Sequence, residues 1–188
     1  MRRDWAAVDD VRLSKRLSYV LRHAPGSVGL QLDDAGWVGV ADLLAALAAH
    51  GAPVSRERLE RLVAADAKQR YALDATGARI RASQGHSVPV DLGHAPQPPP
   101  RVLFHGTPLR ALPAVLAEGL RPGRRHAVHL SEDAATARAV GRRRGPAAVL
   151  RVDAAGLAAA GAPFSRSANG VWLVAAVPPS FLAVIERD

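Results

Sequence analysis

Four short polar stretches contain the residue types in this chain that could do chemistry. They place arginines and histidines in the first half and small polar residues in the second half: Leu21–His23, Arg81–Ser87, His105–Thr107 and Ser167–Leu173. None has the composition of a metal site, a thiol nucleophile or a glycine-rich phosphate loop. Arginine binds phosphate oxygens through two parallel hydrogen bonds. The stretches therefore predict a site that holds negative charge, with phosphate as its expected ligand.

The charge of the chain points in the same direction. The 188 residues carry a formal net charge of +8, and Lys15 and Lys68 are the two lysines among 25 basic residues. Such a charge favours an anionic partner, nucleic acid or a nucleotide. A GC-rich genome also enriches arginine, so charge alone does not decide between a binding surface and a compositional bias.

Several classes of protein are excluded by composition. The chain has no cysteine, which excludes a disulfide framework, a thiolate nucleophile and a cysteine-ligated zinc site. His126 and His129 have a metal-like spacing but lack carboxylate partners, so no metal is expected. No apolar run is long enough to span a bilayer and the first residues do not resemble a secretion signal. We expect a soluble, cytoplasmic protein that does not associate with a membrane and has no obligate protein partner.

A proline-rich stretch, His94–Pro100, divides the chain into two parts of similar length. Three consecutive prolines cannot lie inside a helix or a central strand. The stretch predicts an extended linker between a first domain, residues 1–93, and a second domain, residues 101–188.

The first domain is expected to be helical, with a short hairpin at its end. Leucines and a valine recur at helical spacing between Leu13 and Leu21, with Asp9 or Asp10 as the expected cap. Further helices are expected over 42–47 and 55–65. Two short strands, 71–73 and 79–81, flank a glycine-containing turn. Helices followed by such a hairpin indicate a winged-helix module.

The second domain has a mixed pattern without regular alternation of strands and helices. Strands are expected at 102–104, 128–130, 148–152, 170–174 and 182–185. Helices are expected to end at Gly119 and to begin after a cap at Ser131. The fold class is therefore α+β.

Each polar stretch also has an ordinary structural explanation. Arg22 and His23 would complement the dipole at the end of a helix, and Arg142–Arg144 would be a solvated basic run. The loop around His86 could simply be exposed. His105–Thr107 fits a capped turn, and Asn169 with Gly170 fits a type I′ turn.

Taken in order, the stretches resemble the motifs of the NAD-dependent RNA 2′-phosphotransferase family. The segments that carry the resemblance are Leu13–His23, Leu32–Val38, Arg81–Ser87, His105–Thr107, Val128–Ser131, Val140–Arg143 and Phe164–Leu182. Each segment is short, but the ordered set covers nearly the whole chain and is specific. Three positions, Ser83, Ala127 and Ser165, depart from the family pattern and bear on NAD affinity.

The resemblance implies a fold and a reaction. It implies an N-terminal winged-helix lobe and a C-terminal ADP-ribosyltransferase-like lobe. The activity implied is removal of an internal 2′-monophosphate from RNA, as on a tRNA splice junction, with NAD consumed. The phosphate attacks the nicotinamide ribose and expels nicotinamide, which forms an ADP-ribosylated RNA phosphate. The ribose 2″-hydroxyl then attacks phosphorus and releases 2′-OH RNA and ADP-ribose 1″,2″-cyclic phosphate.

The resemblance also implies roles for individual residues. The catalytic set would be Arg22, His23, Arg81 and Arg143. The NAD pocket would use His105, Gly106, Thr107, Ser131 and Asn169. RNA phosphates would be held by Lys15, His86 and Ser87. The arginines would stabilise the charge on phosphorus, and His23 would orient the phosphate or protonate the departing 2′-oxygen.

Two alternative functions fit the same residues. One is NAD-dependent ADP-ribosylation of terminal nucleic-acid phosphates, which uses the first chemical step alone. The other is a non-catalytic winged-helix protein that binds nucleic acid. Product analysis separates the first alternative from phosphate removal, and thermal stabilisation by NAD separates the second.

Overall fold

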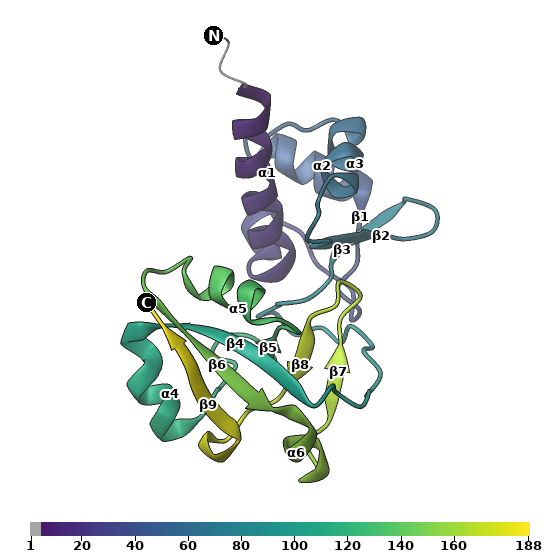
Figure 1. Cartoon of the computed structure of the whole chain (residues 1–188). Helices are drawn as coiled ribbons and strands as arrows, with labels where there is room; N and C mark the ends of the chain where they lie inside the picture. The colour runs from purple at the N-terminus through teal and green to yellow at the C-terminus, as the bar shows by residue number, and fades with distance from the viewer. Residues whose placement is uncertain (1–4) are drawn as a thin grey trace. The chain divides into compact units, whose positions relative to one another are not determined.

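The computed structural model describes residues 5–188, and the side chains of residues 10–188. The chain forms two compact units whose boundary lies between Gly93 and His94. Each unit combines helices with small antiparallel sheets (Figure 1), which confirms the α+β class. Residues 1–4, which belong to the predicted first domain, lie outside the described residues.

Helix α1 (Trp5–Arg22) is the longest helix of the first unit. Leu13, Leu17 and Leu21 are buried along one side of it, as their helical spacing predicts. The predicted cap was wrong, because Asp9 and Asp10 both lie inside the helix. Asp10 instead accepts hydrogen bonds from the guanidinium of Arg58, at 2.7 and 3.0 Å.

The remaining helical elements of the first unit are η1 (Pro25–Val28), α2 (Val40–Ala49) and α3 (Arg56–Ala64). Helix α3 has a capping serine, since the Ser55 hydroxyl accepts from the amide of Arg58 at 3.2 Å. The core of the unit is aliphatic, and Leu43, Leu47 and Ile80 in it have no exposed surface.

A three-stranded sheet completes the first unit. Its strands are β1 (Val38–Gly39), β2 (Tyr71–Leu73) and β3 (Arg79–Ala82), in the order β1-β3-β2 and all antiparallel. The hairpin β2–β3 confirms the predicted pair of strands. Its turn is fixed by the carboxylate of Asp74, which accepts from the amides of Ala78 and Arg79 at 2.9 and 3.2 Å.

The second unit contains two antiparallel sheets. The first has the order β4-β6-β9, formed by β4 (Val102–Pro108), β6 (Ala147–Asp153) and β9 (Leu182–Arg187). The second has the order β5-β8-β7, formed by β5 (Val128–Leu130), β8 (Trp172–Val174) and β7 (Phe164–Arg166). Phe104 and Ser131 exchange backbone hydrogen bonds of 2.8 Å, which join β4 to the end of β5.

Helical elements flank these sheets: η2 (Leu109–Ala111), α4 (Leu112–Glu118), α5 (Ala134–Gly141), α6 (Ala154–Ala159) and η3 (Pro179–Phe181). Helix α5 packs against β4 and β6. The prediction that Ser131 caps α5 was wrong. The cap is Asp133, whose carboxylate accepts from the amide of Thr136 at 2.7 Å, while the backbone of Ser131 is paired with Phe104.

The proline-rich stretch belongs to the second unit, and part of it pairs with β7. Pro96 forms an antiparallel bridge with Ser165, and the amide of Gln97 donates to the carbonyl of Phe164 at 2.8 Å. Within the described residues, no helix is long and apolar enough to cross a membrane.

Candidate functional site

The end of α1 is joined to the loop that follows β3. Arg22 is the last residue of α1, and its carbonyl accepts from the amide of Ser87 at 2.8 Å. The hydroxyl of Ser87 forms a hydrogen bond of 3.0 Å with Nδ1 of His23. Three residues of the predicted site, Arg22, His23 and Ser87, therefore lie together, although Ser87 is 64 positions from His23 in the sequence.

Arg70 lies beside this group and was missed by the sequence analysis. Its carbonyl accepts from the guanidinium of Arg22 at 3.4 Å. Its own guanidinium donates to the hydroxyl of Ser14 at 3.1 Å and pairs with Asp66 at 3.1 Å. The only feature of the sequence that could have indicated Arg70 is its position four residues after Asp66 and directly before Tyr71. That signal is weak without the contact to Arg22.

Tyr71 holds strand β2 against α1 and so fixes the position of Arg70. Tyr71 is 5% exposed, and its hydroxyl donates to the carbonyl of Ser14 at 2.5 Å. The same hydroxyl lies 2.7 Å from the hydroxyl of Ser18. A buried phenol needs such partners, and here they tie two elements together next to Arg22.

The carboxylate of Asp66 organises the chain just before β2. It accepts from the amide of Arg70 at 2.7 Å and is 7% exposed. Gln69, between the two, has a φ of 43°, an uncommon conformation for a residue with a side chain. Ser83 is buried and donates to the carbonyl of Gln69 at 2.7 Å. The serine that departs from the family pattern therefore supports the backbone next to Arg70.

Arg81 and His86 have different surroundings. The guanidinium of Arg81 lies 4.5 Å from the ring centre of Trp37 and donates to the carbonyl of Ala35 at 3.2 Å. His86 is 2% exposed and packs near Gly36. Lys15 is exposed on α1. The catalytic role of Arg81 and the RNA contacts of Lys15 and His86 stay predictions.

In the second unit, His105 and Ser131 lie on adjacent segments. Nδ1 of His105 is 3.0 Å from the carbonyl of His129, so the carbonyl accepts and Nδ1 carries the proton. Burial lowers the pKa of His105, and the nearby charge of Arg125 lowers this pKa further, although the bond to His129 opposes the change. The imidazole is therefore neutral at pH 7, and Nε2 is its acceptor.

Gly106 and Thr107 occupy the part of β4 that packs against α5. A Cβ atom on Gly106 would overlap the carbonyl oxygen of Ala137 and lie 2.9 Å from the amide nitrogen of Gly141. The resemblance implies that this glycine belongs to the NAD pocket. The structure shows a close approach of helix α5 to this glycine, and its contact with NAD stays a prediction. Thr107 is 4% exposed.

Asn169 lies in the turn between β7 and β8. The hydroxyl of Ser167 donates to Oδ1 of Asn169 at 2.7 Å and accepts from the amide of Val171 at 3.0 Å. Gly170 has a φ of 80°, but Asn169 does not have a positive φ. The predicted type I′ turn over Asn169 and Gly170 was therefore wrong, because that turn needs a positive φ at both residues.

Glu132, the residue directly after Ser131, is bonded to this hairpin. Its carboxylate accepts from the indole of Trp172 at 2.9 Å and pairs with Arg166 at 2.8 Å. Trp172 is buried and belongs to the hairpin that carries Asn169. The structure therefore ties the segments of Ser131 and Asn169 together through a glutamate that the sequence analysis did not consider.

The three arginines after α5 divide into two groups. The guanidinium of Arg142 forms hydrogen bonds with the carboxylate of Asp188, and this contact lowers the pKa of Asp188 to about 2. The pKa of Arg125 is lowered by partial desolvation of its guanidinium and by the charges of Arg144 and Arg143, although all three residues are exposed. Arg143 and Arg144 thus belong to a like-charge group with Arg125, which we call the arginine cluster, whereas Arg142 is an anchor for the chain end.

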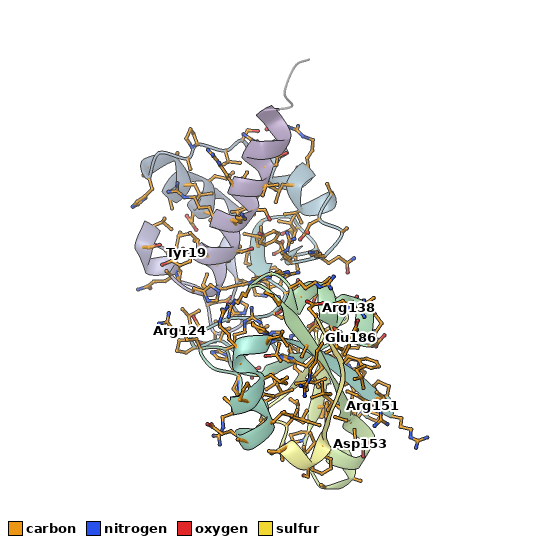
Figure 2. All side chains as sticks on the ribbon, turned by 60° about the vertical axis from the view of Figure 1, so that its left-hand side comes forward. Tyr19, Arg124, Arg138, Arg151, Asp153 and Glu186 are labelled. Carbon is orange, nitrogen blue, oxygen red and sulfur yellow. The ribbon has the colours of Figure 1, made fainter. Side chains whose placement is uncertain are left out.

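Another arginine of the α5 region has a carboxylate partner, as Arg142 does. Arg138 of α5 forms an ion pair with Glu186 of β9, and the two lie together in Figure 2. Within residues 10–188, no guanidinium of the arginine cluster has a carboxylate partner.

The described residues do not hold a group of three or more histidine, aspartate or glutamate side chains that could bind a metal.

The sequence model of the RNA 2′-phosphotransferase, Tpt1 / KptA family matches residues 8–176. The chain belongs to this family. A protein of Agrobacterium fabrum named "Probable RNA 2′-phosphotransferase" is 56% identical over 91% of this chain and 92% of its own length. Proteins with the same name from Streptomyces griseus and Herpetosiphon aurantiacus are each 51% identical, over 92% and 93% of this chain and 95% and 96% of their own lengths. The resemblance to RNA 2′-phosphotransferases is thereby confirmed.

The family's predicted site residues fall in both units. Lys15, Arg22, His23, Arg81, His86 and Ser87 belong to the first unit. The second unit holds His105, Gly106, Thr107, Ser131, Arg143 and Asn169. Direct contacts join Arg22, His23 and Ser87, with Arg70 added, and backbone pairing joins the segments of His105 and Ser131. The function of each of these residues stays a prediction.

Proposed function

We propose that this protein removes an internal 2′-monophosphate from RNA by transferring it to NAD. The products would be RNA with a 2′-hydroxyl, nicotinamide and ADP-ribose 1″,2″-cyclic phosphate. Membership of the RNA 2′-phosphotransferase family supports the activity on RNA. The observation that carries the chemistry is the group of Arg22, His23 and Ser87, with Arg70 beside it.

We also propose a role for each unit. The first unit would be a winged-helix lobe that holds RNA, because its helices are followed by the antiparallel hairpin β2–β3. The second unit would be an ADP-ribosyltransferase-like lobe that holds NAD. Its support is the pairing of β4 with Ser131, which places His105 next to a hydroxyl-bearing segment.

In the first unit, Arg22 and Arg70 would bind the 2′-phosphate of RNA. Arginine suits this task because its donors match two phosphate oxygens at once. Arg70 is held by Asp66 and Ser14 before any substrate arrives. Such fixed donors stabilise a charged transition state at little cost in reorganisation.

His23 would transfer a proton to the 2′-oxygen as that oxygen leaves phosphorus. Because Nδ1 of His23 is bonded to Ser87, we assign the transfer to Nε2. Ser87 would then act by orienting the imidazole. The attack of the phosphate on NAD needs no general base, because a phosphate oxygen is already anionic.

The residues of the second unit fit NAD. Two phosphates of the dinucleotide need cations, and Arg125 and Arg144 of the arginine cluster would supply them, while Arg143 would act in the second chemical step. Ribose hydroxyls need acceptors and donors, and the neutral His105 offers Nε2 while Ser131 offers a hydroxyl. NAD would supply an electrophilic ribose carbon with nicotinamide as its leaving group.

The test is a reaction with a short RNA that carries one internal 2′-phosphate. The protein, NAD and this RNA are incubated together, and the products are resolved by chromatography and mass. We expect phosphate loss that requires NAD, with the cyclic ADP-ribose phosphate formed in equal amount. A stable ADP-ribosyl adduct on a terminally phosphorylated RNA, without phosphate loss from the internal site, would contradict the proposal. So would bound but unchanged RNA.

A variant of the arginine cluster tests the second chemical step. In Arg143→Ala we expect the second step to slow more than the first, because charge builds up on phosphorus in that step. ADP-ribosylated RNA should then accumulate. Arg121→Ala is the control, since Arg121 is a 70% exposed cation of the same unit that pairs with Glu118. An equal loss of rate in both steps would contradict the assignment of Arg143 to the second step.

A further inference from the structure

We propose that Tyr19 is a stacking platform for a nucleobase next to the 2′-phosphate of the RNA substrate. This inference rests on the proposed function, since it describes how the RNA of that reaction is held. It assigns a substrate contact to a residue outside the predicted site, on the same helix as Arg22 and His23.

The first observation is the exposure of Tyr19. Its side chain is 55% exposed, and it lies on the surface of the unit in Figure 2. The chain has three Trp, two Tyr and three Phe residues, and among residues 10–188 Tyr19 is the one aromatic residue of these types that is exposed. The other tyrosine, Tyr71, is buried and bonded through its hydroxyl. A single exposed apolar residue is common, so exposure needs a second observation.

The second observation is the face of α1 on which Tyr19 lies. Arg12, Lys15, Tyr19 and His23 follow one another at spacings of three or four residues, which places them on one face of the helix. We call these four residues the basic stripe, and all four are exposed. The buried residues Leu13, Leu17 and Leu21 define the opposite face. An aromatic ring beside an arginine and a lysine is typical of surfaces that bind single-stranded nucleic acid, since the cations attract the backbone and the ring stacks on a base.

The third observation is the distance from Tyr19 to the predicted site. The ring centres of Tyr19 and His23 are 6.3 Å apart, with an angle of 54° between the ring planes. That separation is short on the scale of a nucleotide, whose phosphate and base lie several ångströms apart. A phosphate held at His23 would therefore place its own base or a neighbouring base within reach of Tyr19.

Stacking also fits the chemistry of an internal 2′-phosphate. Every base has a π-face, so a stacking contact accepts any sequence while it still requires a base. Unpaired bases of single-stranded RNA are commonly held on aromatic side chains in this way. Tyr19 would thus position the RNA strand, and the arginines would bind its phosphate.

The experiment pairs variants of Tyr19 with abasic substrates. The enzyme is compared with Tyr19→Ala and Tyr19→Trp on a short RNA that carries one internal 2′-phosphate. Three further RNAs lack the base of the phosphorylated nucleotide or of either neighbour. Both Kd and the kinetic constants are measured. Val11→Ala is the matched control, because Val11 is 56% exposed on the same helix but outside the basic stripe.

We expect Tyr19→Ala to raise Kd and KM about tenfold, with kcat unchanged. Tyr19→Trp should bind as well as the unaltered protein, and Val11→Ala should have no effect. With one of the three abasic RNAs, the difference between Tyr19→Ala and the unaltered protein should vanish. The inference is overturned if Tyr19→Ala binds all three abasic RNAs more weakly than the unaltered protein does, or if it loses affinity for none of the RNAs. If the unaltered protein binds these RNAs without turnover, the proposed function fails, and the Kd comparison still tests the stacking contact.

Discussion

In the first unit, the guanidinium of Arg70 has Asp66 and Ser14 as fixed partners. In the second unit, the charges that act on Arg125 are those of Arg143 and Arg144, which repel it. Both arrangements concentrate positive charge. They differ in what holds that charge in place before a ligand arrives.

This difference has a physical consequence for binding. A guanidinium held by neighbouring groups loses little freedom when an anion arrives, so its geometry can favour a particular transition state. A group of mutually repelling guanidiniums gains most from any anion that neutralises it, and depends less on the exact shape of that anion. We therefore expect the first unit to be sensitive to geometry and the arginine cluster to be sensitive mainly to charge.

The largest effect is expected from Arg22. Arg22→Ala should lower kcat by roughly 10²- to 10³-fold, because it removes a positioned donor to the reacting phosphate. Arg22→Lys should restore little of this loss, since an ammonium cannot form the paired contacts of a guanidinium. Single-turnover rates on the 2′-phosphorylated RNA provide the measurement.

Arg143→Lys is the matching variant in the arginine cluster and should retain most of the activity that Arg143→Ala loses. If lysine serves equally well at both positions, the contrast between the two units is wrong.

An intermediate effect is expected from Asp66, which positions Arg70. Asp66→Ala removes the acceptor for the amide of Arg70 and the partner of its guanidinium. The loss of a buried hydrogen-bond partner should lower the free energy of unfolding by about 1–3 kcal/mol. Turnover should fall as well, because Arg70 loses its fixed position next to Arg22.

Denaturant unfolding and kcat are measured together for this variant. Asp66→Asn keeps an acceptor for the amide and should recover most of the stability but less of the activity. Recovery of both to the same extent would show that Asp66 has a purely structural role.

Elements with a strong local pattern could be predicted from the sequence. The buried leucines of α1 repeat at helical spacing, and the hairpin β2–β3 has two short strands around a glycine turn. The start of α1 could not be predicted, because Asp9 and Asp10 have the chemistry of caps while the helix continues through them. Competition between nearby capping residues likewise explains the error at Ser131, where Asp133 supplies the cap.

Contacts between distant segments account for the part of the site that the sequence did not reveal. Arg70 meets Arg22 across 48 positions, and Glu132 meets Trp172 across 40 positions. No local pattern encodes such pairs. The helix α6 and the strand β7 were missed for a different reason, because each is short and lies in an alanine- and glycine-rich region with little periodicity.

The smallest effect is expected on the pH dependence of stability, through the titration of His105 in the second unit. Burial lowers the pKa of His105 below the model-peptide value of 6.5. The unfolded chain therefore binds a proton more readily than the folded protein, so stability should be complete above pH 6.5 and fall as the pH decreases toward the lowered pKa. His105→Asn keeps a donor for the carbonyl of His129 but cannot be protonated. The dependence of Tm on pH between neutral and mildly acidic solution should be weaker in this variant. An unchanged dependence would mean that the pKa of His105 is the same in the folded and the unfolded protein. Burial would then not be what keeps the imidazole assigned to NAD neutral.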